Sequence, residues 1–428
     1  MRKKALVVLA AVAVLSLLCG AAFADDKVIL RFVDGQGGND GILASYKEII
    51  ALFEKQNPAY KVEYQQYTVT TLNEFLKPAL AAGQAPDMFA VYAGPDAIEM
   101  VQAGVLVDIK PLIDNEWKKW LGPGYNFKGT NMKGGIYLTP QDALTECVWY
   151  HKDMLKKLGW PAKPFTQAYS MEEYIQMVGK AKGVGLNVME AGFLEPWCYF
   201  NPFFNFVHQL QPSESPDMVE QAMNGQISWK QDVFRKPLEA YAKMNKAGVW
   251  RPDALNMDYQ VQAFGKWLEK NSIFMWAQGD WFAGSMKKED NNPQNPSIGI
   301  TQYPTIDPKS VVSYNKNFGS DIGLYTKGKN QKASLAFMRL TNSPQAAQIF
   351  IRHGVNPAAG VDPTNVPKTD NPVFNDCIVL YNSPGRFSEI IYFNPQAVKA
   401  IGDGIGNVVL GVQKPDEVLS ELDKVTRK

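Results

Sequence analysis

Two tryptophans stand beside carboxylate side chains in segments that the sequence places at strand ends. Glu195-Pro196-Trp197 lies in a stretch rich in aromatic residues, and Gln278-Gly279-Asp280-Trp281 follows a run predicted to be a strand. An aromatic ring offers a flat apolar surface for the C–H face of a sugar, and carboxylate or amide groups can bond the sugar hydroxyls. This pattern favours a carbohydrate site, although aromatic clusters also form protein cores.

Two further loops carry polar groups after predicted strands. In the segment 34–41 the glycines allow close approach of the backbone to a ligand, and Gln36, Asn39 and Asp40 add planar polar groups. Asp40 could equally cap the helix that follows. Tyr92 and Asp96 stand at a similar helix entrance. Both loops are therefore candidate ligand contacts.

Patterns that would indicate an enzyme are incomplete. The segment 323–330 nearly matches the phosphate-binding G-x-x-x-x-G-K-[ST], but Asn330 replaces the hydroxyl residue that would bind magnesium. The glycines of 402–406 lack dinucleotide-binding spacing, and the three histidines form no H-E-x-x-H. We expect no catalytic residue, no metal and no cofactor. A glycoside-cleaving carboxylate pair stays open, because a sequence does not report carboxylate separation.

Predicted strands and helices alternate along the chain. The first block comprises 28–33, 40–56, 62–64, 71–83 and 87–92, in the order strand, helix, strand, helix, strand. Further strands are predicted at 135–139, 145–150, 272–276 and 298–303, and further helices within 169–248 and at 331–340, 344–353 and 415–428. This alternation predicts an α/β fold with mainly parallel sheets flanked by helices. Ligands of such sheets bind beyond the carboxyl ends of the strands, where the candidate loops lie.

The N-terminal residues have the order typical of a secretory signal. Basic residues 2–4 precede an apolar run at 5–18, and Ala22-Phe23-Ala24 supplies a small-x-small cleavage pattern. The run is short for a membrane span, which needs about 20 apolar residues. We predict a signal peptide at 1–24 and a periplasmic or extracytoplasmic mature chain. A lipid anchor on Cys19 is a weaker alternative, because bulky leucines precede it.

Composition limits the classes of partner and the architecture. The chain has 44 Lys and Arg against 43 Asp and Glu, and three of the basic residues belong to the leader. Without a basic patch, a nucleic-acid partner is not expected. A mature chain of about 400 residues predicts two domains. Cys147, Cys198 and Cys377 allow at most one disulfide, and a buried thiol is expected for each.

Several motifs, in a fixed order, resemble those of the family 1 extracellular solute-binding proteins of ABC importers, the maltose-binding-protein-like sugar-binding proteins. They are Ala85-Pro86-Asp87 with 104–109, Asp142-Ala143-Leu144 with 149–153, Glu195-Pro196-Trp197, Gly279-Asp280-Trp281 and 411–419. The resemblance implies a two-lobed periplasmic-binding-protein fold with a hinge, and a ligand held between the lobes without covalent chemistry. It also implies delivery of a small molecule, a sugar or oligosaccharide, to membrane permease subunits. We expect a monomer.

The resemblance places lobe 1 at 25–143 and 305–353, and lobe 2 at 144–304 and 354–428. It implies ligand contacts at Gln36, Tyr92, Asp96, Asp142, Glu195 and Trp197, with Trp281 as the stacking platform. The loops read directly from the sequence add Asn39, Asp40, Gln141, Asp280, Asn317 and Asp321. A polyol or polyamine ligand stays open, because carboxylates and aromatics would also suit a polyamine. A secreted carbohydrate-active enzyme is the alternative from another class.

Overall fold

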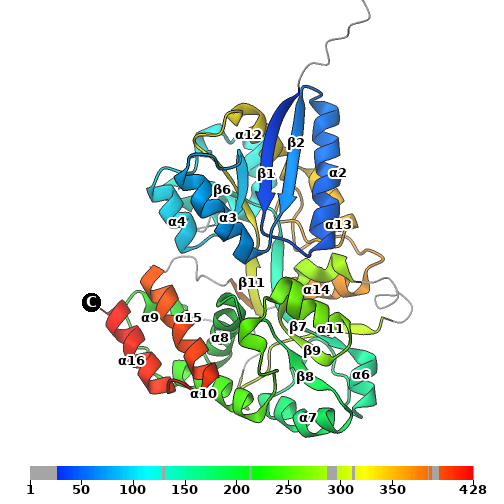
Figure 1. The fold of residues 1–428 in the computed structure, drawn as a ribbon, viewed down its shortest axis with the longest axis vertical. Coiled ribbons are helices and arrows are strands. Elements are labelled where there is room, and N and C mark those ends of the chain that lie inside the picture. The colour runs from blue at the N-terminus through cyan, green and yellow to red at the C-terminus, as the bar shows by residue number, and fades with distance from the viewer. Residues whose placement is uncertain are drawn as a thin grey trace, which may run out of the picture.

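The computed structural model describes residues 27–127, 131–211, 215–286, 296–310, 314–383, 385–387 and 395–427. The expected signal peptide at 1–24 lies outside these residues. Figure 1 shows two α/β lobes, one above the other, with the start of the described chain in the upper lobe and its C-terminus in the lower one. The two-lobed α/β architecture predicted from the sequence is therefore confirmed.

Lobe 1 is built on a five-stranded sheet in the order β2-β1-β3-β12-β6. The strands are β1 (Val28–Asp34), β2 (Tyr60–Gln66), β3 (Met88–Val91), β12 (Asp321–Leu324) and β6 (Leu138–Pro140). β1 pairs in parallel with β2 and β3, whereas β12 is antiparallel to both β3 and β6. The parallel strands all point their carboxyl ends towards lobe 2, which brings the loops that follow β1, β2 and β3 to one edge (Figure 1).

The helices of lobe 1 cover this sheet. They are α2 (Asp40–Gln56), α3 (Val69–Ala81), α4 (Pro95–Gln102), α5 (Asn115–Leu121), α12 (Gln331–Thr341) and α13 (Pro344–Arg352), with short turns at η1 (Lys110–Leu112) and η2 (Gly122–Asn126) and a hairpin of β4 (Asn131–Met132) and β5 (Gly135–Ile136). In α2, the apolar residues Ile42, Tyr46 and Ile49 recur at helical spacing and are all buried. The N-cap is Asn39, whose side chain accepts a bond from the backbone of Ile42, so the cap lies one residue before Asp40.

Lobe 2 contains a mixed six-stranded sheet in the order β13-β11-β7-β9-β8, with β10 also paired to β7. The strands are β7 (Ala143–His151), β8 (Asn187–Glu190), β9 (Ser272–Gly279), β10 (Ile298–Thr301), β11 (Tyr314–Phe318) and β13 (Gly385–Phe387). β7 enters from lobe 1 and runs antiparallel to β9, β10 and β11, while β8 and β13 lie parallel to their neighbours. This sheet therefore has more antiparallel pairs than strand–helix alternation predicts.

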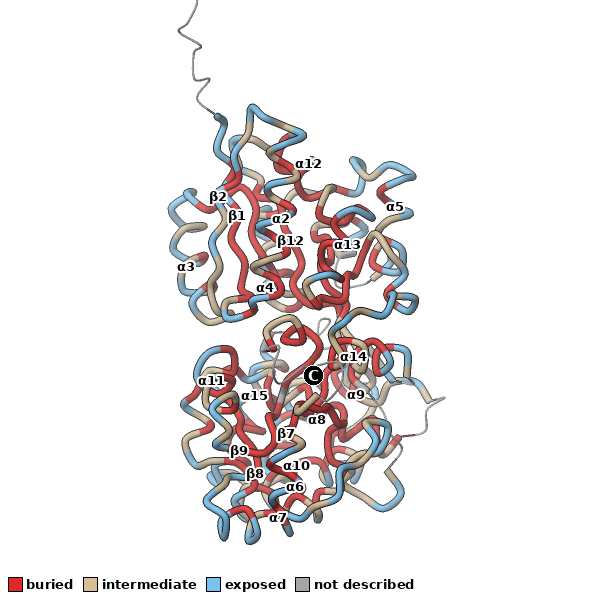
Figure 2. Tube along the Cα trace, turned by 90° about the vertical axis from the view of Figure 1, so that its right-hand side faces the viewer, coloured by how far each residue is buried: buried red, intermediate tan, exposed pale blue. Residues whose placement is uncertain are grey.

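The helices of lobe 2 enclose an aromatic core. They are α6 (Lys152–Lys157), α7 (Met171–Gly183), α8 (Trp197–Leu210), α9 (Met218–Met223), α10 (Asp232–Ala247), α11 (Phe264–Leu268), α14 (Pro372–Asn382), α15 (Pro395–Leu410) and α16 (Pro415–Thr426), with short turns at η3 (Ala254–Asn256), η4 (Tyr259–Ala263) and η5 (Asp280–Ser285). Trp149, Trp267 and Trp276 are fully buried in this core. Cys147, Cys198 and Cys377 are buried free thiols, as expected. In Figure 2 each lobe has its own buried interior beneath exposed loops and helix surfaces.

The chain crosses between the lobes at three places. It passes through the start of β7, then between β11 and β12, and again after Gly360, just beyond the bridge from Pro357 to Asp142. β11 pairs with β7, so it belongs to lobe 2, whereas the boundary at 305 placed it in lobe 1. Val355 and Ala359 pack in the lobe 1 core, beyond the expected boundary at 353. No helix in the described ranges is long and apolar enough to cross a membrane.

Candidate ligand-binding cleft

A cleft of about 1030 Å³ lies between the two lobes. Lobe 1 contributes Gln36 after β1, one face of α3, the end of β3 with the loop that follows it, and the first turns of α4. Lobe 2 contributes the start of β7, the N-terminal turn of α8, and one face of α15. The volume is at the upper end of the range for small-molecule sites, and walls from two separate units are a common arrangement for such sites.

Eight of the residues predicted from the sequence line this cleft. They are Gln36, Tyr92, Asp96, Asp142, Glu195, Trp197, Trp281 and Asn317. They come from both lobes and from six separate segments of the chain. The structure therefore brings together all seven residues implied by the family resemblance, but only Asn317 of the six added from the loops.

The five other predicted residues lie outside the cleft lining, each with another role or position. The Asn39 side chain caps α2 and donates a hydrogen bond to the backbone carbonyl of Trp281. Asp40 is exposed, and its backbone N–H donates to Ser285 Oγ over 2.9 Å. The Gln141 amide is buried against Thr139.

Asp280 and Asp321 are buried behind the cleft surface. Burial raises the pKa of both carboxyls well above the usual range, and the charge of Asp142 adds to the effect. Neither residue presents its side chain as part of the lining. The geometry therefore does not favour the expected role of Asp280 and Asp321 as direct ligand contacts.

The aromatic wall of the cleft consists of three rings that meet edge to face. Trp197 lies 6.0 Å from Trp281 with an interplanar angle of 72°, and 4.7 Å from Tyr259 with an angle of 89°. Trp281 is only 6% exposed, whereas Trp197 is half-buried. A Cβ at Gly279 would lie 2.1 Å from the Trp281 ring, so this packing requires glycine. Trp197 is thus the more accessible flat surface.

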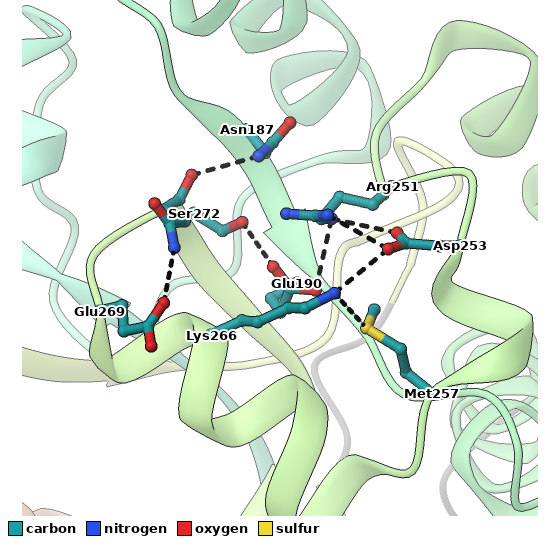
Figure 3. A network of polar contacts seen from close by, with 9 residues as sticks. Asn187, Glu190, Arg251, Asp253, Met257, Lys266, Glu269 and Ser272 are labelled. Carbon is teal, nitrogen blue, oxygen red and sulfur yellow. Dashed lines mark hydrogen bonds and ion pairs between the residues drawn. The ribbon is translucent and has the colours of Figure 1, made fainter.

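Sequence reasoning missed Tyr259. A polar network, shown in Figure 3, fixes the segment that precedes it. Both Arg251 and Lys266 bond Asp253, at 3.1 and 3.2 Å. The buried Glu190 accepts from Ser272 at 2.9 Å and lies 3.8 Å from the Arg251 guanidinium. This network ties the segment before Tyr259 to β8, β9 and α11. No local motif marks Tyr259, because its place in the cleft depends on contact with Trp197 from a separate segment.

Buried carboxyl groups give the lobe 2 wall its electrostatic character. Burial raises the pKa of Asp142 to about 7, although the backbone N–H of Ser320 donates to it at 3.0 Å. Burial likewise raises the pKa of Glu146 to about 7. Asn201 and Asn315 donate to its two oxygens at 2.6 and 3.1 Å. These acids are therefore partly protonated near neutral pH.

Several polar atoms at the cleft wall have unused hydrogen-bonding capacity. Within the described part of the chain, Asp142 Oδ2, Asn201 Oδ1, Asn317 Oδ1 and Trp281 Nε1 are buried and have no hydrogen-bond partner. Buried polar groups are rarely left without partners, so a bound ligand that donates and accepts hydrogen bonds is a natural complement. Across the described ranges, no group of three or more His, Cys, Asp or Glu is arranged to hold a metal ion.

Comparison with known proteins gives a family match over most of the chain. The model of the bacterial extracellular solute-binding proteins matches residues 39–348. Two uncharacterized ABC transporter extracellular-binding proteins of Pyrococcus horikoshii are 23% and 22% identical. The matches cover 59% and 62% of this chain and 55% and 58% of those proteins. The match thus spans less than two thirds of the length of these relatives.

Three solved structures share the fold over nearly the whole chain. One is a chitin oligosaccharide binding protein (TM-score 0.74, 20% identity, 94% of this chain and 98% of that one). A second comes from work on xylan utilization by Caldanaerobius polysaccharolyticus (TM-score 0.75, 19% identity, 93% and 100%). A third is a solute-binding protein in complex with raffinose (TM-score 0.69, 16% identity, 94% and 99%). At these identities the likeness establishes the fold alone.

Proposed function

Because the chain belongs to the bacterial extracellular solute-binding proteins, we propose that it is the substrate-binding component of an ABC importer and captures a sugar or oligosaccharide in the interlobe cleft. One observation carries this proposal. Unpartnered polar atoms of Asp142, Asn201 and Asn317 lie in the same wall as the half-buried ring of Trp197. A sugar presents hydroxyls to the former and a C–H face to the latter. The solved relatives with the same fold include proteins for chitin oligosaccharide and raffinose.

The raised pKa values of Asp142 and Glu146 favour a neutral ligand over a polyamine. With pKa values near 7, Asp142 and Glu146 carry less negative charge than ordinary carboxylates at neutral pH. A cationic polyamine would first have to drive these two carboxyls into their charged form, whereas a neutral sugar can bond a carboxyl group in either protonation state. A linear polyol would bond the same groups but makes less use of the flat Trp197 ring.

We also propose that the protein captures its ligand by closure of the two lobes. The sheets support lobe 1 at about 27–141 and 319–360 and lobe 2 over the rest, with the hinge at the three crossings. Solution scattering should show a smaller radius of gyration when the sugar saturates the protein. An unchanged radius, with binding confirmed by calorimetry, would contradict hinge closure.

Export and delivery complete the proposed function. A signal peptide cleaved after Ala24 would release the protein outside the cytoplasm, where the closed monomer docks on permease subunits. Intact mass of protein purified from its native host should correspond to a chain beginning at Asp25. A lipid-modified Cys19 at the N-terminus would contradict this.

The decisive experiment is a thermal-shift screen of the mature protein against neutral oligosaccharides, sugar alcohols and polyamines. A ligand at 100 times its Kd stabilises the folded state by about 2.7 kcal/mol. We expect an oligosaccharide to give the largest shift, and Trp197→Ala to abolish most of it. Trp160→Ala, which removes a ring of the same kind outside the cleft, is the matched control. A shift with polyamines alone would refute the sugar proposal, and release of smaller sugars on incubation would indicate an enzyme.

A further inference from the structure

One glutamine of lobe 2 has its side chain anchored in lobe 1. Gln260 lies in η4 beside Tyr259 and is only 2% exposed. Its Nε2 donates to the backbone carbonyls of Gly35 at 3.0 Å and Gly37 at 3.1 Å, and its Oε1 accepts from the backbone N–H of Val69 at 2.9 Å. Both amide hydrogens and the amide oxygen of this side chain are therefore used across the lobe interface.

The lobe 1 side of this contact is built to receive an amide. The backbone N–H of Gly37 donates to the Tyr67 carbonyl at 2.7 Å, which ties the loop after β1 to the loop after β2. A Cβ at Gly37 would lie 2.8 Å from the Tyr67 backbone, and Gly38 has a φ of +83° that favours glycine. The glycines of 34–41, expected to approach a ligand, thus bring the backbone into position for Gln260.

The contact lies immediately beside the cleft without forming its wall. Gln36, between the two accepting glycines, lines the cleft, and so does Tyr259, next to Gln260 in the chain. A second bond across the lobes runs nearby, from Thr70 Oγ1 to Glu195 Oε1 at 2.8 Å. When Gln260 is bonded, the ligand-facing residues of both lobes are held opposite each other.

We propose that Gln260 is an interlobe latch, a positioning residue that stabilises the closed arrangement of the lobes. Its bonds need the lobe approach seen in this structure, so a hinge opening that separates Gly35, Gly37 and Val69 from η4 would break them. They would therefore shift the open–closed equilibrium towards the form in which the cleft is assembled. The apparent Kd of a ligand rises by the inverse of the binding-competent fraction, so a protein without the latch binds more weakly although every cleft residue is intact. The consequence for affinity rests on the proposed function; the latch itself does not.

The latch can be tested on the mature protein without any ligand. Glu99 on α4 and Gln396 on α15 are exposed, and these helices face each other across the cleft. Spin labels on cysteines introduced at these two positions report the distance between the lobes by pulsed electron paramagnetic resonance. Gln260→Ala and the similarly shaped Gln260→Met remove the bonds. Gln262→Ala alters an exposed glutamine whose amide bonds Asp258 within its own loop.

We expect the wild type and Gln262→Ala to share a short-distance, closed population. Both Gln260 variants should reduce the ratio of closed to open molecules by about tenfold, which corresponds to ~1.4 kcal/mol. Circular dichroism should show that all variants are folded. The proposal is overturned if the Gln260 variants keep the wild-type distances, or if the wild type has no closed population. Because no sugar is added, these outcomes are independent of the screen that tests the proposed function.

Discussion

Replacement of Trp281 by alanine should reveal how far one ring serves both the cleft and the core. The ring is 6% exposed, packs against Gly279 and meets Trp197 edge to face at 6.0 Å. Truncation of a buried tryptophan costs about 3–5 kcal/mol of unfolding free energy. The lost aromatic pair accounts for about 0.5–1.5 kcal/mol of it. We expect Trp281→Ala to lose about 3–5 kcal/mol, and the half-buried Trp197→Ala about 1–2 kcal/mol.

Ligand affinity separates the two roles further. Stacking of a base on an aromatic ring is worth about 1–3 kcal/mol, and the same scale for a sugar face predicts a 5- to 150-fold loss of affinity. We expect this loss in Trp197→Ala, and in Trp281→Ala through its exposed edge and its support of Trp197. Urea unfolding followed by circular dichroism gives the stabilities, and titration calorimetry with the best oligosaccharide of the screen gives the affinities.

Two results would refute this reasoning. A stability loss below about 1 kcal/mol in Trp281→Ala would show that the ring is not part of the lobe 2 core, contrary to its burial. Wild-type affinity of the folded Trp281→Ala protein would show that the ring neither stacks on the ligand nor positions Trp197. Trp160→Ala again serves as the control for loss of a tryptophan elsewhere in lobe 2.

Two more predictions concern Glu146 and Gly284. Burial raises the pKa of Glu146 to about 7, whereas the same group in the unfolded chain titrates near pH 4.3. Between these values the folded protein binds a proton that the unfolded chain has released. The contribution of Glu146 to the free energy of unfolding therefore falls as pH rises from about 4 to about 7. In urea unfolding at a series of pH values, Glu146→Gln should flatten this decline, whereas Glu269→Gln, at an exposed position, should not. An equal dependence of stability on pH in the wild type and both variants would contradict the prediction. A Cβ at Gly284 would lie 2.0 Å from the His353 carbonyl oxygen, so Gly284→Ala should cost about 1–3 kcal/mol or hold the lobes apart. Gly265→Ala, which meets no atom within 4 Å, is its control, and equal melting temperatures would exclude the clash.

The sequence by itself determined the fold class and much of the cleft. Helical spacing of apolar residues identified α2, and alternation of strands and helices identified the lobe 1 sheet, because periodicity is a local property. Polar residues placed directly after parallel strands, such as Gln36 and Tyr92, reached the cleft, because the carboxyl ends of these strands meet at one edge. The composition and the motif order indicated the family that the match over 39–348 then established.

Other features were decided only by the tertiary structure. Asn39 and the glycines around it serve contacts with lobe 2, a role that depends on how closely the lobes approach. β8 lies within the stretch 169–248, which the sequence predicts to be mostly helical. A strand of four residues is too short to show an alternating pattern. Tyr259 and Gln260 carry no motif. Gln260 bonds partners almost 200 residues or more away in the chain, and Tyr259 meets the Trp197 ring from another segment. The carboxyl pKa values are raised because segments distant in the sequence bury these groups, and the same segments together form the walls of the cleft. No local sequence pattern encodes either feature.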